Sequence, residues 1–183
     1  MKYRNITVSG EIATGTTTLA LRLAQDKLGW EYINVGKWFR QYCREHNLPL
    51  EETGRQSDEV HRQMDEAVLD RLRREEKLVV EGWLAGFMAR DIPGVLKVLL
   101  VAPMAVRVKR FMKREGVSEP QAQEQMVQRT KENLAKWGQM YGTTEFFKKD
   151  WYDLVVDTGV NDEEQTLAQV YGKITDINDG NFS

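Results

Sequence analysis

Residues 6–18 read ITVSGEIATGTTT, an apolar strand pattern that runs directly into two glycines five positions apart and then three threonines. A glycine, four residues, a second glycine, then Lys and Ser or Thr is the spacing of a phosphate-binding loop that opens a helix. Gly10, Gly15 and Thr17 match this spacing, whereas Thr16 stands where the lysine is expected. Glycines let successive backbone N–H groups turn toward an anion, and a helix N-terminus adds about half a positive charge. The stretch therefore predicts a strand, a phosphate-binding loop and a helix.

The threonines after the second glycine carry the predicted chemistry of this loop. The hydroxyl of Thr17 is at the position that ligates a magnesium ion bridging nucleotide phosphates. Thr16 supplies no charge, so the loop lacks the cation that would accompany the transferring phosphoryl group. The alternative interpretation is a glycine turn that joins a strand to a helix and binds nothing. The loop alone does not distinguish a phosphate-binding loop from such a turn, so the distinction depends on residues elsewhere in the chain.

Composition limits the classes of protein to which the chain can belong. It has 183 residues, of which 41% are hydrophobic and 30% charged, as is typical of one globular domain. A formal net charge of −2 argues against a protein that coats nucleic acid or an anionic membrane. Cys43 is the only cysteine, so no internal disulfide can form. Because no apolar run reaches membrane-spanning length and no secretion signal is evident, we expect a soluble, cytoplasmic protein.

Short β-branched runs alternate with longer helical patterns, which is typical of a parallel sheet with crossover helices. The expected strands are residues 5–9, 31–35, 78–81, 95–101 and 153–157. The expected helices are residues 16–28, 37–45, 58–75, 103–114, 119–140 and 163–174. No repeat or linker divides the chain, so a single domain over residues 1–183 is predicted. Ligands of such sheets bind beyond the carboxyl ends of the strands.

Two charged residues follow strands at that edge. Arg40 lies near the start of the helix after Gly36, and its planar guanidinium can hold an acceptor phosphate. A solvent-exposed helix arginine is the alternative. Glu81 ends the third expected strand, where a carboxylate can hold magnesium through water or orient an attacking hydroxyl. Its alternative role is an ion pair with a neighbouring Lys or Arg.

Two basic helices follow the fourth expected strand. At 100° per residue, Arg107, Arg110 and Arg114 fall within an arc of about 60° beside an apolar stripe on the first helix. Ser118 is the expected N-cap of the second helix, and Pro120 lies in its first turn. One face of this second helix carries Arg129, Glu132, Asn133 and Lys136. The pair is predicted to form a lid over polyphosphate; the alternative is a charge-rich hairpin that only provides a soluble surface.

In this order and spacing, these motifs resemble the archaeal-type cytidylate kinases, a branch of the P-loop nucleoside monophosphate kinases. The resemblance covers residues 7–86 and 102–158. It rests on ITVSG…GTTTLA, the turn with Gly36, Phe39 and Arg40, VVEGxLAG at 79–86, REGVS at 114–118, Arg129, Tyr141-Gly142 and YDLV at 152–155. Members of this branch also carry threonine at the position of Thr16. The resemblance implies an α/β P-loop NTPase fold, a five-stranded parallel sheet in the order 2-3-1-4-5 with helices on both faces, an acceptor-binding helical region at 36–76 and a lid at 107–142.

The resemblance also implies transfer of the terminal phosphoryl group of ATP to CMP or dCMP with Mg²⁺. The residues implied to bind ATP are Gly10, Ile12, Ala13, Thr14, Gly15, Thr16, Thr17 and Thr18, and those implied to bind magnesium are Thr17 and Glu81. The residues implied to act on the reacting phosphates are Arg129, Lys136, Arg107 and Arg110. The residues implied to bind the acceptor are Arg40, Gly36, Trp83, Asp65 and Asn133. The expected partners are small-molecule nucleotides, with no nucleic acid or membrane, and the expected state is a monomer or weak dimer.

Several positions depart from the family pattern. The family has an arginine in EGRLAG that reaches the acceptor phosphate, whereas Trp83 stands there and supplies no charge. Lys136 replaces an arginine and loses bidentate recognition. His61 takes the position of an expected acid, and Glu11 and Ile12 are bulkier than the residues expected early in the loop. Two further hypotheses follow: a kinase of the same fold that acts on another small acceptor, and a degenerate P-loop domain that binds nucleotide without transferring phosphate.

Overall fold

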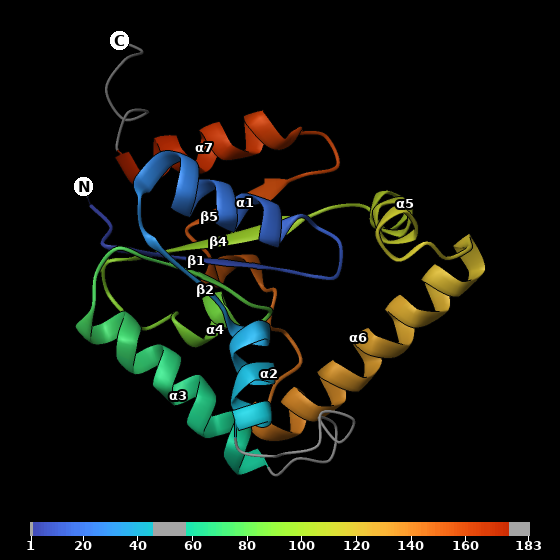
Figure 1. Cartoon of the computed structure of the whole chain (residues 1–183), viewed down its shortest axis with the longest axis horizontal. Helices are drawn as coiled ribbons and strands as arrows, with labels where there is room; N and C mark the ends of the chain where they lie inside the picture. Colours follow the sequence, from blue (N-terminus) through green and yellow to red (C-terminus); the bar gives the residue numbers. More distant parts are fainter. Residues whose placement is uncertain (1, 46–57, 176–183) are drawn as a thin grey trace.

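A five-stranded parallel sheet forms the centre of the molecule (Figure 1). The computed structural model describes residues 2–45 and 58–175. The strands are β1 (Asn5–Gly10), β2 (Glu31–Asn34), β3 (Leu78–Glu81), β4 (Val95–Val101) and β5 (Leu154–Asp157). Their order is β2-β3-β1-β4-β5, and all neighbours are parallel. The predicted fold class and strand order are confirmed, and each expected strand end lies within one residue of the observed one. Residues 46–57 of the predicted acceptor-binding region 36–76 lie outside the described residues.

The central strand β1 is buried along all six of its residues. Its first residue, Asn5, is polar but fully satisfied. The Asn5 amide nitrogen donates to the carbonyl oxygens of Leu72 at 3.1 Å and Glu75 at 2.8 Å, and its Oδ1 accepts the N–H of Leu78 at 2.9 Å. These bonds tie the end of α3 (Asp58–Arg74) to the start of β3. Because β1 and β3 also pair in register, the segments that follow the two strands emerge side by side.

Helices cover both faces of the sheet (Figure 1). One face is covered by α1 (Thr16–Arg22), the π-helix η1 (Leu23–Leu28) and α7 (Glu163–Thr175), which share a buried cluster that includes Leu19, Leu23, Leu167, Val170 and Ile174. The other face is covered by α3 and the short α4 (Ala85–Met88), through Val68, Leu72, Ala85 and Ala89. The expected helix at 16–28 is therefore an α-helix continued by a π-helix. Neither α4 nor the short 3₁₀ turn η3 (Lys149–Trp151) has a counterpart among the expected helices.

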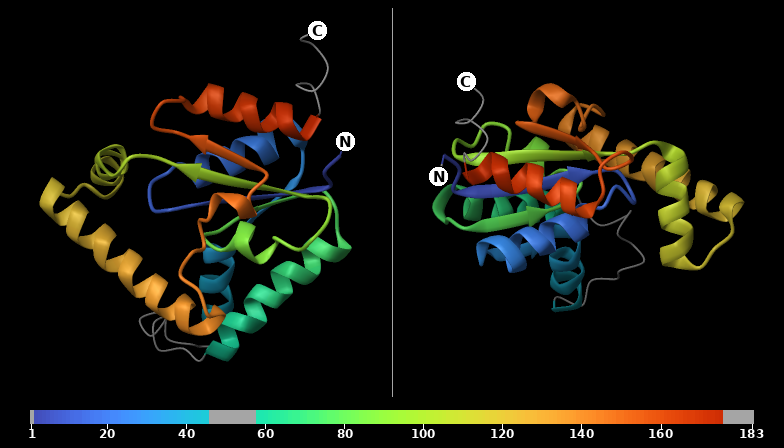
Figure 2. Two further views of the ribbon diagram at one scale, coloured as in Figure 1. Left: turned by 180° about the vertical axis from the view of Figure 1, so that it is seen from behind. Right: turned by 90° about the horizontal axis from the view of Figure 1, so that it is seen from above.

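Two long helices, α5 (Met104–Glu115) and α6 (Glu119–Tyr141), follow β4 and extend beyond the carboxyl end of the sheet (Figure 2). They pack on each other and on the loop after β1 through Ile12, Val108, Phe111, Ala122 and Met126. The turn between them uses Gly116 at φ 69° and a capping box, in which the Gln121 side chain accepts the Ser118 N–H at 3.0 Å. The predicted N-cap at Ser118 is confirmed.

The helix α2 (Val35–Glu45) begins immediately after β2, so its first turn lies at the carboxyl edge of the sheet. The end of α2, the start of α3 and the end of α6 come together on one side of the sheet, at the bottom of Figure 1. Within residues 2–45 and 58–175, no helix combines the length and the apolar character needed to cross a membrane.

Candidate active site

The loop between β1 and α1 has a backbone suited to binding an anion. Ala13 has a φ of 64° and Gly15 a φ of 96°, both in the left-handed region. Such turns direct successive N–H groups to one side. The first turn of α1 contains no acidic residue, and the Leu19 N–H bonds to the Gly15 carbonyl at 3.1 Å. The N–H groups of residues 16–18 therefore have no intrahelical acceptor, which suits a phosphate.

Packing explains why the first glycine of the motif is a glycine. A Cβ at Gly10 would lie 2.4 Å from Thr14 Oγ1 and 2.7 Å from the Leu100 carbonyl oxygen. Both contacts are too short, so a larger residue would displace the loop. Thr14 is itself buried, and its hydroxyl donates to the Glu11 carbonyl at 2.9 Å. This bond closes the loop over the end of β1.

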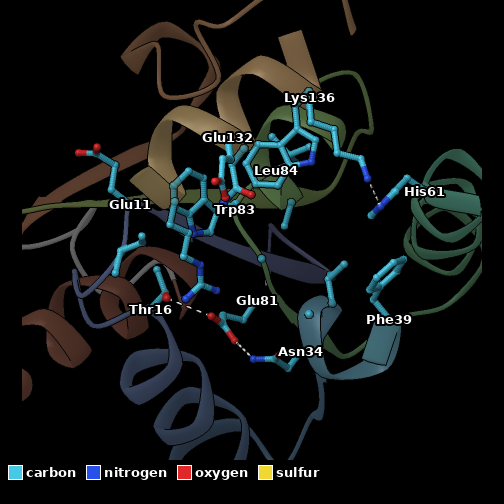
Figure 3. A pocket seen from close by; sticks show the side chains of 18 of the residues that line it. Glu11, Thr16, Asn34, Phe39, His61, Glu81, Trp83, Leu84, Glu132 and Lys136 are labelled. Carbon is cyan, nitrogen blue, oxygen red and sulfur yellow. Dashed lines mark hydrogen bonds between the residues drawn. The ribbon is translucent and has the colours of Figure 1, made fainter. Parts of the chain in front are cut away.

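Glu81, at the carboxyl end of β3, is the polar centre of the site (Figure 3). Its Oε1 accepts hydrogen bonds from the hydroxyls of Thr16 at 3.0 Å and Thr17 at 3.2 Å. Its Oε2 accepts from the Tyr32 hydroxyl at 3.0 Å and from the Asn34 amide. No Lys or Arg within the described ranges forms an ion pair with this carboxylate. Four neutral donors therefore orient Glu81 without neutralising its charge.

A cavity of about 1680 Å³ opens beyond the carboxyl ends of the strands, bounded by the loop, α2, α3 and α6. The predicted site residues that line it are Ile12, Ala13, Thr16, Thr17, Gly36, Arg40, Asp65, Glu81, Trp83, Arg129, Asn133 and Lys136. The remaining loop residues, Gly10, Thr14, Gly15 and Thr18, are not among the lining residues. Glu132 lines the cavity as well. All four residues of the α6 face that was predicted from the sequence therefore line the cavity.

Arg107 and Arg110 do not line this cavity. The buried guanidinium of Arg107 forms an ion pair with Glu11 at 3.1 Å. Arg110 donates to the Thr158 hydroxyl at 2.9 Å and to the Thr158 carbonyl at 2.6 Å. Thr158 in turn donates to the Thr14 carbonyl at 2.8 Å. Both arginines thus contact the phosphate-binding loop or the segment after β5, and the structure does not bring them together with the lining residues of α6.

Trp83 forms part of the cavity wall. Its ring centroid lies 5.2 Å from that of Trp137 and 5.7 Å from that of Phe147. The indole is partly buried and packs against two apolar clusters, one under the loop and one under the end of α6. The cations that line the cavity are Lys37 and Arg40 on α2, Arg114 on α5, and Arg129 and Lys136 on α6. Positive charge therefore reaches the cavity from the helices, while the strand end that carries Trp83 supplies none.

Polar contacts join α3 to α6, and a ring stack joins α3 to α2, at the far end of the cavity. The Lys136 ammonium group lies within hydrogen-bond distance of His61 Nε2 (Figure 3), and the His61 ring stacks on Phe39 with centroids 4.5 Å apart. Asp65 accepts a hydrogen bond from the Tyr141 hydroxyl. Burial raises the pKa of Asp65 to about 6, and the bond from Tyr141 opposes this rise. Tyr141 thus holds the Asp65 carboxyl group at this wall of the cavity.

Comparison with known proteins identifies the family. The sequence model of the family described as cytidylate kinase-like matches residues 5–160 of the chain. The chain belongs to this family. The cytidylate kinase of Pyrococcus abyssi is 34% identical over 172 residues, which cover 92% of each chain. That of Thermococcus kodakarensis is 36% identical over 156 residues, 84% of this chain and 78% of the relative.

Solved kinase structures share the fold of this cytidylate kinase-like chain. The shikimate kinase from Acinetobacter baumannii superposes with a TM-score of 0.62 at 15% identity, covering 96% of this chain and 95% of its own. At that identity the likeness shows the fold alone. The family membership and the kinase relatives together support a nucleotide kinase.

Two residues of the cytidylate kinase-like site, Tyr32 and Asn34, were not predicted from the sequence. Their alternation on an expected strand places both side chains on one side of it. This signal becomes useful only once β2 is known to pair with β3, because that register sets Asn34 opposite Glu81. Trp137 also lines the cavity and is not among the predicted site residues.

Proposed function

We propose that the protein transfers the terminal phosphoryl group of ATP to the phosphate of CMP or dCMP. The observation that carries the proposal is the position of Glu81, which contacts the first turn of α1 and lines a cavity that also receives cations from α2 and α6. The similarity of the chain to cytidylate kinases along most of its length supports the choice of acceptor.

The phosphate-binding loop is the proposed site of the donor phosphates. The N–H groups of residues 12–17 would hold them, with support from the positive end of α1. Gly10 and Thr14 shape the loop, and Gly15 supplies its left-handed turn. At the start of α1, the N–H group of Thr18 would bind the donor phosphates together with those of Thr16 and Thr17. The proposal therefore assigns ATP to the side of the cavity formed by β1 and α1.

Magnesium fits the oxygen atoms present beside the loop. Mg²⁺ prefers oxygen ligands and is usually held by one or two carboxylates together with substrate phosphates and water. Thr17 and Glu81 offer a hydroxyl and a carboxylate 3.2 Å apart, and the carboxylate is not neutralised by a described Lys or Arg. When bound, the ion would neutralise charge on the donor phosphates. Thr17 would contact it directly, and Glu81 would assist through water.

The acceptor is proposed to lie between α2, α3 and α6. Arg40 would hold its phosphate, and Asp65 and Asn133 would face its nucleoside. Gly36 lines the cavity at the start of α2, beside the proposed phosphate site. Arg129 and Lys136 on α6 would compensate charge on the transferring group. Phosphoryl transfer depends on positioning and charge compensation more than on covalent chemistry, so cations of α6 can replace the lysine that the loop lacks.

In this proposal residues 1–183 form one kinase domain, in which the segment 36–76 binds the acceptor and the segment 107–142 is a lid. Arg107 and Arg110 belong to the lid but contact Glu11 and Thr158. Their proposed role is therefore to hold the loop for ATP, and any direct contact with phosphate would require them to exchange these partners.

A coupled assay of ADP formation tests the function. ATP and Mg²⁺ are supplied with CMP, dCMP, UMP, AMP, GMP or no acceptor. We expect turnover with CMP and dCMP well above that with the other acceptors. Turnover only with a different acceptor would show that the protein is a kinase of the same fold that acts on another small substrate. Trp83, which replaces the arginine of the family, is the residue that favours this alternative. Absence of turnover with every acceptor would leave a domain that binds nucleotide without transfer.

Introducing the missing lysine is expected to impair the enzyme. Because the Thr16 hydroxyl lies 3.0 Å from Glu81 Oε1, the ammonium group of a Thr16→Lys variant would pair with this carboxylate and neutralise it. We expect kcat to fall by about 10- to 100-fold. Gln25→Lys adds the same charge at an exposed position of η1 and is expected to leave kcat unchanged. A rise in kcat for Thr16→Lys would show instead that the loop is deficient in charge.

A further inference from the structure

The two oxygens of Glu81 face different parts of the protein. Oε1 faces the hydroxyls of Thr16 and Thr17, where the donor phosphates and magnesium are proposed to bind. Oε2 faces β2, the edge strand, and is held there by Tyr32 and Asn34. The pairing of β2 with β3 sets Asn34 opposite Glu81, so both β2 side chains reach the same carboxylate oxygen. One oxygen is thus directed toward the reaction and the other is anchored.

We propose that Tyr32 and Asn34 are positioning residues that anchor Oε2 of Glu81 and thereby present Oε1 to the magnesium and donor phosphates. The inference rests on the proposed function and extends it to two side chains to which that function assigns no contact with the phosphates or the acceptor. It predicts that either side chain, when truncated, weakens the contribution of magnesium to nucleotide binding while the loop itself stays intact.

The chemistry of the two anchors suits this role. Both are neutral donors, so they fix the carboxylate without neutralising the charge that a cation requires. The Tyr32 hydroxyl donates to Oε2 at 3.0 Å. The Asn34 amide also donates to the Tyr32 oxygen at 3.1 Å, which closes a three-membered network with Glu81. A lysine or arginine in either place would instead compete with the metal ion.

Asn34 has a second contact that Tyr32 lacks. Its Oδ1 accepts the backbone N–H of Lys37 at 2.7 Å, in the first turn of α2. Asn34 therefore links Glu81 to the start of α2, whereas the Tyr32 hydroxyl bonds to Glu81 and to Asn34 only within the network itself.

Calorimetric titration with AMP-PNP, with and without Mg²⁺, tests the role of Tyr32. In the parent protein we expect Mg²⁺ to increase the affinity for AMP-PNP. In Tyr32→Phe, which keeps the ring and loses the hydroxyl, we expect this increase to shrink by about 3- to 10-fold, with unchanged affinity in EDTA and unchanged KM for CMP. Tyr171→Phe, on the helix α7 and outside the cavity lining, is the matched control and is expected to match the parent.

Asn34→Ala separates positioning from general structural damage. Here we expect the same loss of the Mg²⁺ effect together with a severalfold rise in KM for CMP, because the contact with Lys37 N is lost as well. A Mg²⁺ effect in Tyr32→Phe within about 1.5-fold of the parent would overturn the inference, as would an equal loss of AMP-PNP affinity in EDTA. A parent protein that shows the full Mg²⁺ effect but phosphorylates no acceptor would contradict the proposed function alone.

Discussion

Replacement of Arg129 by alanine is expected to lower kcat for transfer from ATP to CMP by about 10²- to 10³-fold, while KM for ATP changes less than about threefold. Arg129 lies on α6, is exposed, and lines the cavity. Within residues 2–45 and 58–175 no ion pair engages its guanidinium. Thr16 provides no cation in the loop. In the proposed function, the charge that compensates the transferring phosphoryl group therefore comes from α6.

A matched variant separates this role from a general loss of positive charge. Lys131→Ala removes one cation from an exposed position of the same helix outside the cavity lining, and its kcat should equal that of the parent. Steady-state kinetics and the melting temperature are measured for both variants. If Arg129→Ala retains a kcat within a few fold of the parent, α6 does not replace the missing lysine. Arg40 and Arg114, the other arginines that line the cavity, would then be the candidates for the compensating charge.

The regular part of the fold follows from local patterns. Strand boundaries were predictable to a residue because β-branched runs such as Leu78–Glu81 are short and bounded by charged or glycine-rich segments. The strand order came from the family resemblance, since sequence spacing alone leaves several orders open. The short helix α4 was not predictable, because four residues are too few to show a helical period. The π-helix η1 keeps the apolar faces of an ordinary helix closely enough that its pattern looks α-helical.

The candidate site was predictable where a side chain's direction follows from its element. The α6 face with Arg129 and Lys136 lines the cavity as helical spacing predicts. Helical spacing also predicted that Arg107 and Arg110 share one face of α5. Spacing does not show which protein groups accept hydrogen bonds from their guanidinium groups in place of a phosphate. In the structure Glu11 and Thr158, each remote in sequence from α5, take those bonds. Contacts of this kind depend on tertiary structure and remain invisible to a single sequence.

Glu81→Gln is expected to reduce kcat/KM for ATP by about 10²- to 10³-fold in the presence of Mg²⁺. Glutamine keeps the volume of the side chain but removes the charge that a divalent cation requires. A carboxylate accepts on both oxygens, whereas an amide has one acceptor oxygen and one NH₂ donor. The NH₂ group must face either the hydroxyls of Thr16 and Thr17 or the donors on β2. At least one of the four hydrogen bonds is lost in either orientation unless a hydroxyl reverses its role.

The expected result has a specific signature in binding. Affinity for AMP-PNP in EDTA should match the parent, because the loop backbone is unchanged, while the gain on adding Mg²⁺ should nearly disappear. Glu163→Gln, an exposed carboxylate on α7, is the control for the loss of one negative charge and should behave as the parent. If the Glu81→Gln enzyme keeps a kcat/KM within about fivefold of the parent, Glu81 does not contribute to the proposed metal site.

The double variant Glu81→Gln/Tyr32→Phe tests whether Tyr32 acts through Glu81. If Tyr32 acts only by orienting Glu81, its hydroxyl has nothing left to position once the carboxylate is gone. The double variant should then be no more impaired than Glu81→Gln, so the effects of the two single substitutions will not add. Additive losses would mean that Tyr32 contributes to the site by a route independent of Glu81. The same cycle with Asn34→Ala should leave only the rise in KM for CMP, because the contact of Asn34 with α2 does not pass through the carboxylate.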